Sequence, residues 1–175
     1  MKITIHIVEW AVVGCLLGCN SVKINPHTTV VAKDKAALQN ANVYWNERER
    51  DVITACIERK QLNVQLHQSG YYFQIVQPGK GAVVRNGSEV TLQCQIFLLD
   101  GTLCYDYDAA HPLQFVVGNS NTMTGLHVAL EKLPQGTEAL FLFSSHLGYG
   151  LLGDGNKIPP QSPLLLKVKI VNLNN

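Results

Sequence analysis

Residues 143–166 read FSSHLGYGLLGDGNKIPPQSPLLL. An apolar strand leads into this segment, and the strand LLLKVKIVNL at 164–173 leaves it. Between them lie four glycines and Pro159-Pro160, and a loop of this length is uncommon in a compact domain unless it is functional or folds on itself. Tyr149 lies between two glycines and Ile158 precedes the prolines. The pattern predicts a lip over a shallow apolar pocket; the alternative is that the glycines and prolines only make turns.

The composition indicates one folded domain with extensions. The chain has 175 residues, of which 46% are hydrophobic and 15% are charged, enough apolar surface to form a core. The net charge of +1 gives no reason to expect nucleic acid as a partner. The cysteines and histidines have no metal-ligand spacing, so we expect neither a metal site nor a cofactor.

The N-terminus has the pattern of a bacterial lipoprotein signal. A positive Lys2 is followed by an apolar stretch at 10–18 that is too short to span a bilayer as a helix. It ends in LLGC, which resembles the lipobox and predicts a signal peptide at 1–18 with lipidation of Cys19. The alternatives are lipidation of Cys15 in VVGC, a plain signal and an uncleaved anchor. Lipidation predicts membrane attachment in the bacterial cell envelope, facing the periplasm or the cell surface.

Two segments separate this signal from the domain. Residues 19–42 are polar and predict a tether. Residues 43–68 predict an amphipathic helical extension, because apolar residues recur there at three- and four-residue spacings; they are Trp45, Val52, Ile53, Cys56 and Ile57. The apolar stripe packs either on the domain or on a second copy of the chain, as a homodimer through residues 45–60.

The rest of the chain, residues 69–175, predicts an α+β domain. Strands are expected at 70–77, 89–99, 102–107, 113–117, 138–143 and 164–173. One helix is expected at 125–133, with Thr124 as its N-cap. Together they predict five or six antiparallel strands with one short helix across them. Whether Cys94 and Cys104, which flank the Asp100-Gly101 turn, form a disulfide is left open.

These motifs, in this order, resemble the FK506-binding-protein (FKBP) family of prolyl isomerases over about residues 71–173. The matching segments are GAVVRNGSEVTL (81–92), LDGT (99–102), PLQF (112–115) with Gly118, GLHVALEKLPQG (125–136), LGYG (147–150), and IPP (158–160) with the final strand. The preceding helix looks like that of periplasmic members with an N-terminal extension. With the lipobox, it is most similar to gliding-motility-associated isomerase lipoproteins.

The resemblance implies a peptidyl-prolyl cis-trans isomerase that assists the folding of exported proteins and takes proline-containing polypeptides as substrates. Rotation about an X-Pro amide crosses a barrier of about 18–20 kcal/mol, because it breaks C–N resonance. Such a catalyst needs no nucleophile, metal or cofactor. It needs an apolar pocket that holds the proline ring, excludes water and favours the twisted amide.

The resemblance also implies the site residues. Three are assigned to catalysis: the Tyr149 hydroxyl, the backbone N–H of Met123, and Asp106. The substrate-binding positions are Tyr105, Leu113, Phe115, Leu126, Ile158, Leu166 and Cys94. The family's Phe-Asp pair after the hairpin corresponds either to Cys104-Tyr105 without a gap or to Tyr105-Asp106 after a one-residue shift. We prefer the shift, because it keeps an aromatic wall and an acid.

Three positions depart from the family pattern. Cys94 replaces a tyrosine, Leu126 replaces the tryptophan of the pocket floor, and Leu166 replaces a phenylalanine on the last strand. Each change removes ring area from a site that works by enclosing a ring. Activity is therefore expected to be reduced, and the alternative is a non-enzymatic lipoprotein that serves as a protein-interaction or chaperone module.

Overall fold

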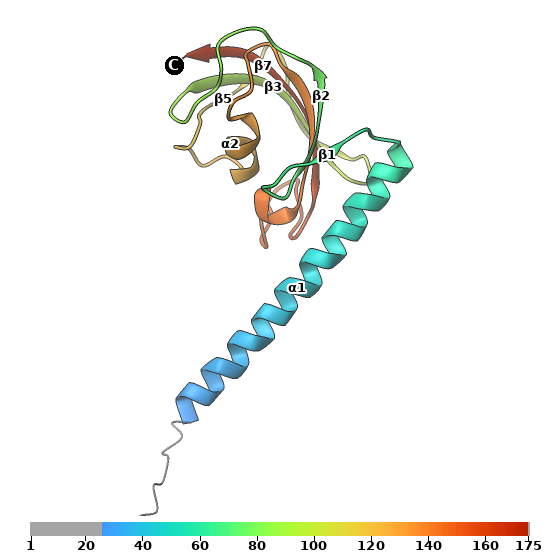
Figure 1. Ribbon diagram of the computed structural model, residues 1–175, viewed down its shortest axis with the longest axis vertical. Helices are drawn as coiled ribbons and strands as arrows, with labels where there is room; N and C mark the ends of the chain where they lie inside the picture. Colours follow the sequence, from blue (N-terminus) through green and yellow to red (C-terminus); the bar gives the residue numbers. More distant parts are fainter. Residues whose placement is uncertain (1–25, 175) are drawn as a thin grey trace, which may run out of the picture. The chain divides into compact units, whose positions relative to one another are not determined.

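The computed structural model describes the backbone of residues 26–174 and the side chains of residues 43–174 (Figure 1). The expected signal peptide and Cys19 therefore lie outside the described residues. The chain divides into two units, Met1–Gln39 and Asn40–Asn175. The described part of the first unit is helical throughout. The second unit contains the rest of that helix, the sheet and the short helices, and it carries the candidate site.

Helix α1, Pro26–Lys60, is longer than the sequence pattern predicts. It begins inside the segment expected to be a tether. Proline suits a first helical turn because its missing N–H has no intrahelical partner there, and the following residues are rich in helix-favouring alanine and lysine. This part of α1 lacks an apolar stripe, which is the signal that the periodicity argument needs. The helix ends at Lys60, inside the extension predicted at 43–68, and Gln61 then adopts a left-handed φ of 51°.

A single antiparallel sheet of seven strands forms the domain, in the order β1-β2-β6-β7-β3-β4, with β5 also paired to β3. The strands are β1 (Gln65–Leu66), β2 (Tyr72–Gln77), β3 (Glu89–Leu98), β4 (Leu103–Tyr107), β5 (Leu113–Val116), β6 (Glu138–Phe143) and β7 (Leu164–Asn174). The α+β class and the six predicted strands are confirmed. The two-residue β1 is too short to leave a period in the sequence.

The two faces of the sheet form separate cores. Along β3 every second side chain is buried, as the alternation of a strand requires. Those side chains join the main core with helix α2 (Thr124–Leu130), which lies within the curve of the sheet (Figure 1). On the opposite face Ile53 and Cys56 of α1 pack against Leu140, Leu142 and Leu165. The apolar stripe of α1 therefore packs on the domain, although its members Trp45 and Val52 are exposed.

The start of α2 is fixed by a close approach. Met123, and not Thr124, is the N-cap, and no side chain caps the helix. A Cβ on Gly125 would lie 2.8 Å from the carbonyl oxygen of Leu147 and 2.9 Å from the ring of Phe143. Only glycine therefore lets α2 approach the segment that leads to Tyr149. The helix ends at Leu130, short of the predicted position 133.

Candidate active site

A cavity of about 280 Å³ opens between β3, β5, the start of α2 and the loop that carries Tyr149. Four of the sequence-predicted site residues line it: Tyr149, Met123, Leu113 and Phe115. Ile96 and Tyr107, which sequence reasoning did not select, complete the apolar and aromatic wall, and the polar segment 120–122 forms one edge. The cavity therefore combines apolar surface with a few hydrogen-bonding groups.

The position of Tyr149 is set by the turn around it. A short 3-10 helix, η1 (Ser145–Leu147), precedes it. The carbonyl oxygen of Ser145 accepts hydrogen bonds from the N–H groups of Gly148 at 3.0 Å and Gly150 at 2.7 Å. Gly150 has a φ of 68°, which favours glycine. One carbonyl thus holds both residues that flank the tyrosine.

The phenol of Tyr149 is a hydrogen-bond donor at neutral pH. Burial raises the pKa of Tyr149 to about 12, and the nearby groups of Tyr107, Tyr105, Asp154 and Cys94 act in the same direction. The side chain is half-buried and packs on the main core. A protonated phenol in such a place can donate to a carbonyl oxygen in the cavity.

Met123 offers a second donor. It lines the cavity, and its carbonyl accepts the first hydrogen bond of α2, from Leu126 at 3.0 Å. No acceptor for its own N–H occurs among the residues whose side chains the structure describes. An N–H group at the N-terminus of a helix has no partner within the helix, so it is available for a ligand.

Asp154 holds the loop beyond Tyr149, and sequence reasoning missed it. Its Oδ1 accepts from the N–H groups of Asn156 at 2.9 Å and Ile158 at 2.8 Å. Its other oxygen accepts from the hydroxyl of Tyr105. Burial by itself would raise the pKa of Asp154, but the hydrogen bonds from Tyr105, Ile158 and Asn156 outweigh it, and the pKa is lowered. The Gly-Asp-Gly-Asn sequence at 153–156, typical of an Asx turn, could have identified this residue.

Tyr105 does not line the cavity itself but lies behind Tyr107, which does. Its ring stacks on that of Tyr107 with the centroids 6.0 Å apart, and the ammonium of Lys157 lies 5.1 Å from the ring centroid. The hydrogen bond to Asp154, followed by burial, raises the pKa of Tyr105. The strand β4 thus sends Tyr105 and Tyr107 to the side of the sheet where Tyr149 lies.

The structure does not bring Asp106 to this cavity. Asp106 is exposed, accepts a 3.1 Å hydrogen bond from the Gln95 amide, and lines a different hollow of about 710 Å³ with Lys167 and Lys169. Neighbouring residues of a strand point to opposite faces, so Asp106 cannot share a side with Tyr105. The one-residue shift is therefore a wrong alignment. The ungapped pair fits instead: the register between β3 and β4 shifts between Ile96 and Phe97, opposite Cys104, so Cys104 lies in the main core and Tyr105 packs against the same core.

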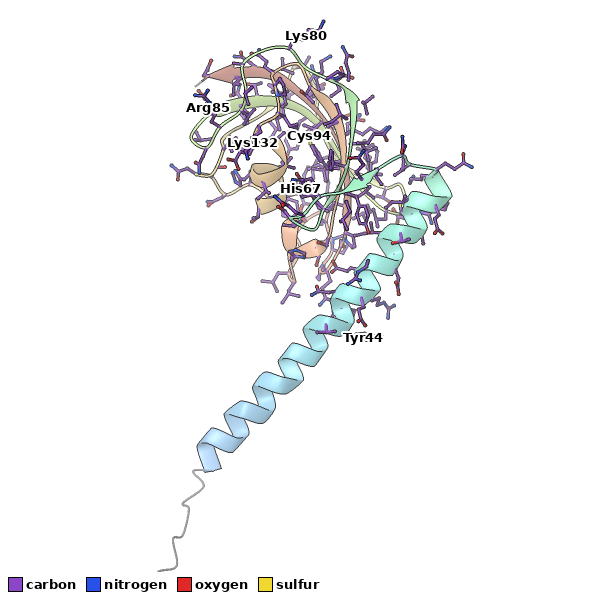
Figure 2. All side chains as sticks on the ribbon, viewed as in Figure 1. Tyr44, His67, Lys80, Arg85, Cys94 and Lys132 are labelled. Carbon is purple, nitrogen blue, oxygen red and sulfur yellow. The ribbon has the colours of Figure 1, made fainter. Side chains whose placement is uncertain are left out.

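The remaining predicted residues are buried and do not line this cavity, and Cys94 lines the hollow that Asp106 also lines. Leu126 and Leu166 are 0% exposed, and Ile158 and Cys94 are also buried, all within the core cluster on which Tyr149 packs. Figure 2 shows Cys94 inside the domain among the strands. Burial, with a smaller contribution from Asp106, raises the pKa of Cys94 to about 12, so the thiol is protonated. These side chains support the cavity and do not form its surface.

The described cysteines are unpaired: Cys56, Cys94 and Cys104 are free thiols. Cys104 instead points its sulfur at the carbonyl oxygen of Lys157, 3.7 Å away, at the end of the Asp154 turn. In residues 43–174 no group of three or more histidine, cysteine, aspartate or glutamate side chains could hold a metal ion.

Comparison with known proteins identifies the family of this chain. The model of the FKBP-type peptidyl-prolyl cis-trans isomerase family matches residues 81–171, just over half of the chain. The chain therefore belongs to that family. The reaction that gives this family its name is rotation about the X-Pro amide.

Individual relatives agree. The chain is 31% identical over 112 residues to a probable FKBP-type peptidyl-prolyl cis-trans isomerase, FkpA, of Neisseria meningitidis, covering 63% of this chain and 40% of that one. It is 29% identical to the FKBP-type 22 kDa isomerase of Escherichia coli, covering 65% of this chain and 55% of that one. The chain thus spans about half the length of these curated relatives. A solved isomerase from Pseudomonas syringae shares the fold, with a TM-score of 0.64 and 21% identity over 75% of this chain and 95% of its own.

Proposed function

We propose that this domain catalyses cis-trans isomerisation of X-Pro bonds in exported polypeptides. The observation that carries the proposal is the protonated phenol of Tyr149 on an apolar cavity walled by Phe115, Leu113 and Met123. No covalent bond is made or broken in this reaction. The site therefore has only to bind the proline ring, exclude water and stabilise the twisted amide.

In this mechanism the proline ring enters the cavity between Tyr107 and Phe115. The Tyr149 hydroxyl and the Met123 N–H are the donors available to the substrate carbonyls. As the amide twists, the conjugation between its nitrogen and its carbonyl is lost, and the polarity of the carbonyl changes. A hydrogen-bond donor fixed in a half-buried site therefore stabilises the planar and the twisted forms of the amide by different amounts. One such hydrogen bond contributes about 0.5–1.5 kcal/mol.

A peptide isomerisation assay tests the proposal on the unit of residues 40–175. Tyr149→Phe removes the donor and keeps the ring, so kcat/KM should fall roughly two- to tenfold. Tyr44→Phe is the matched control, because Tyr44 is exposed on α1 (Figure 2) and should leave the rate unchanged. An isomerisation rate equal to that of buffer, with a folded circular dichroism spectrum, would reject the enzymatic proposal.

We also propose that a lipid at Cys19 attaches the chain to a membrane of the bacterial cell envelope. The lipobox pattern supports this proposal, and none of the described helices is long and apolar enough to cross a bilayer. Labelling cells with a fatty-acid analogue distinguishes the two candidate cysteines. The label should be lost in Cys19→Ala and kept in Cys15→Ala, and the reverse result would move the lipid to Cys15.

A homodimer through residues 45–60 is a further proposal. Part of the α1 stripe packs on the domain, but Tyr44, Trp45 and Val52 remain exposed on the helix. Sedimentation of the full chain tests whether a second copy covers them. A monomer at high concentration would remove the dimer.

A second function, a non-enzymatic binding module, is favoured by the surface beside Tyr149. Leu152 is 85% exposed and Leu151 is also exposed, so two apolar side chains stand in solvent on the site loop. This module would hold unfolded polypeptide without isomerising it. Suppression of client aggregation that survives Tyr149→Phe but is lost in Leu151→Ser/Leu152→Ser would support binding alone.

A further inference from the structure

Glu49 of α1 has a buried carboxylate that the proposed mechanism, with its donors Tyr149 and Met123, does not use. It is 8% exposed, and the described residues provide it with no ion pair. A carboxylate in such a place needs strong hydrogen bonds to offset its lost hydration. Ser145 supplies two such hydrogen bonds: its N–H donates to Oε2 at 2.8 Å and its hydroxyl to Oε1 at 2.5 Å.

Ser145 connects this carboxylate to the candidate catalytic tyrosine. Ser145 is itself buried, 5% exposed, and is the first residue of η1. Its carbonyl oxygen accepts from the N–H groups of Gly148 and Gly150, on either side of Tyr149. The path from Glu49 to Tyr149 therefore consists of two consecutive sets of hydrogen bonds through a single residue.

The helix that carries Glu49 is anchored to the sheet at its other end. Arg59, ten positions along α1, donates to the carbonyl oxygen of Leu99 at 2.7 Å. Cys56 packs in the second core, on the face of the sheet opposite the main core. These contacts fix residues 49–60 of α1 on the domain. The Glu49 carboxylate is thus presented to η1 from a docked element.

We propose that Glu49 is a positioning residue for Tyr149, acting through Ser145, and that the N-terminal helix is in this way part of the active site. The proposal rests on the proposed isomerase function for its kinetic consequence. Its structural consequence, the fixed turn at Gly148–Gly150, is independent of activity. Loss of the carboxylate frees both donors of Ser145 and lets its carbonyl turn away from the two glycines.

The kinetic test uses a double-mutant cycle on the full chain. Glu49→Ala should lower kcat/KM about two- to tenfold, mainly through kcat, and the loss should not exceed that of Tyr149→Phe. In a Tyr149→Phe background Glu49→Ala should have little further effect, because its action passes through the hydroxyl. Glu47→Ala, an exposed acid on the same helix, is the control and should leave kcat/KM unchanged. Full additivity of the two changes would overturn the proposal.

The structural test is the amide spectrum of the two glycines by ¹⁵N NMR. The Gly148 and Gly150 resonances should shift in Glu49→Ala and stay in place in Glu47→Ala. Glu49→Gln should restore them, because the amide oxygen can accept from the Ser145 N–H and the amide nitrogen can donate to its hydroxyl. If Glu49→Ala does not fold, Ser145→Ala, which removes only the hydroxyl bond, gives the same test with a smaller shift.

The kinetic and the NMR measurements distinguish failure of the proposed isomerase function from failure of the positioning role. Shifted glycines in a chain without isomerase activity would reject the proposed function and keep the positioning role of Glu49. Unshifted glycines in a folded Glu49→Ala chain would reject the positioning role whatever the activity.

Discussion

Asp154 makes the sharpest prediction about the site loop. Replacing it with alanine removes three acceptor contacts at once: those to the Tyr105 hydroxyl and to the N–H groups of Asn156 and Ile158. The turn at 154–158 then loses the group that closes it. We expect both the free energy of unfolding and the isomerase activity to fall, because this turn carries the buried Ile158 beneath the cavity.

The magnitude follows from the number of contacts. A net contribution of about 0.5–1.5 kcal/mol per hydrogen bond gives a loss of roughly 1.5–4.5 kcal/mol for the three, nearer the lower value where solvent can replace a partner. Tyr105→Phe removes one contact and should cost about 1 kcal/mol. Both changes remove the same Tyr105–Asp154 hydrogen bond. Adding Tyr105→Phe to Asp154→Ala should therefore lower the free energy of unfolding by no more than about 0.5 kcal/mol further.

Urea unfolding and kcat/KM together measure these effects, with the slope of the transition checked for constancy. Asp108→Ala is the matched control: Asp108 also closes a turn, by accepting from the N–H groups of Ala110 and His111, but its turn lies outside the cavity lining. It should change activity little. Strict additivity of Tyr105→Phe and Asp154→Ala, or an equal loss of activity in Asp108→Ala, would refute this account.

The remaining predictions concern pH and the glycines of the same loop. The folded pKa of Asp154 lies below its ordinary 3.8, so its stabilisation is present above that pH and is lost as the pH falls through the folded pKa; the unfolding midpoints of wild type and Asp154→Asn should converge in acid. The pKa of Tyr149 is raised to about 12, so its contribution is constant near neutrality and stability falls as the pH rises from 10 through 12, as measured by thermal unfolding. Gly153→Ala should destabilise the chain more than Gly155→Ala in urea unfolding: both have left-handed φ values near 70°, but only at Gly153 would the Cβ lie 2.2 Å from the Ile158 carbonyl oxygen.

The fold follows from local patterns in the sequence where each strand has one buried face. The alternation along 89–98 and the apolar run at 138–143 are long enough to define β3 and β6, and the Asp100-Gly101 turn fixes the hairpin between β3 and β4. The extent of α1 could not be predicted in the same way. Residues 26–42 favour a helix by propensity, but their sequence has no apolar stripe, and a periodicity argument cannot detect such a segment.

The site was less predictable, because its residues are set by strand direction and by loop contacts. Choosing Asp106 by residue type ignored that it must face away from Tyr105. The turn that Asp154 closes has a local sequence signal at 153–156, but its distant partner Tyr105 is brought to it only by the fold. Ile96 lies within the strand predicted at 89–99, but its place on the cavity depends on the segments 113–115 and 120–123, which only the fold brings to the same opening.

The replacement of aromatic residues by Leu126 and Leu166 has a different consequence for the expected activity once the positions of the two leucines are known. The sequence argument for weak activity assumed that Leu126 and Leu166 form the surface that holds the proline ring, but both are fully buried below it. The aromatic surface of the cavity comes instead from Phe115, Tyr107 and Tyr149, with the Tyr105 ring stacked behind Tyr107. Leucines beneath a wall affect its support more than its contact area, because contact area is set by the side chains that reach the opening. The missing rings therefore argue against catalysis less than the sequence indicated, and the group that matters most is the one that holds the turn around Tyr149, the Ser145 carbonyl.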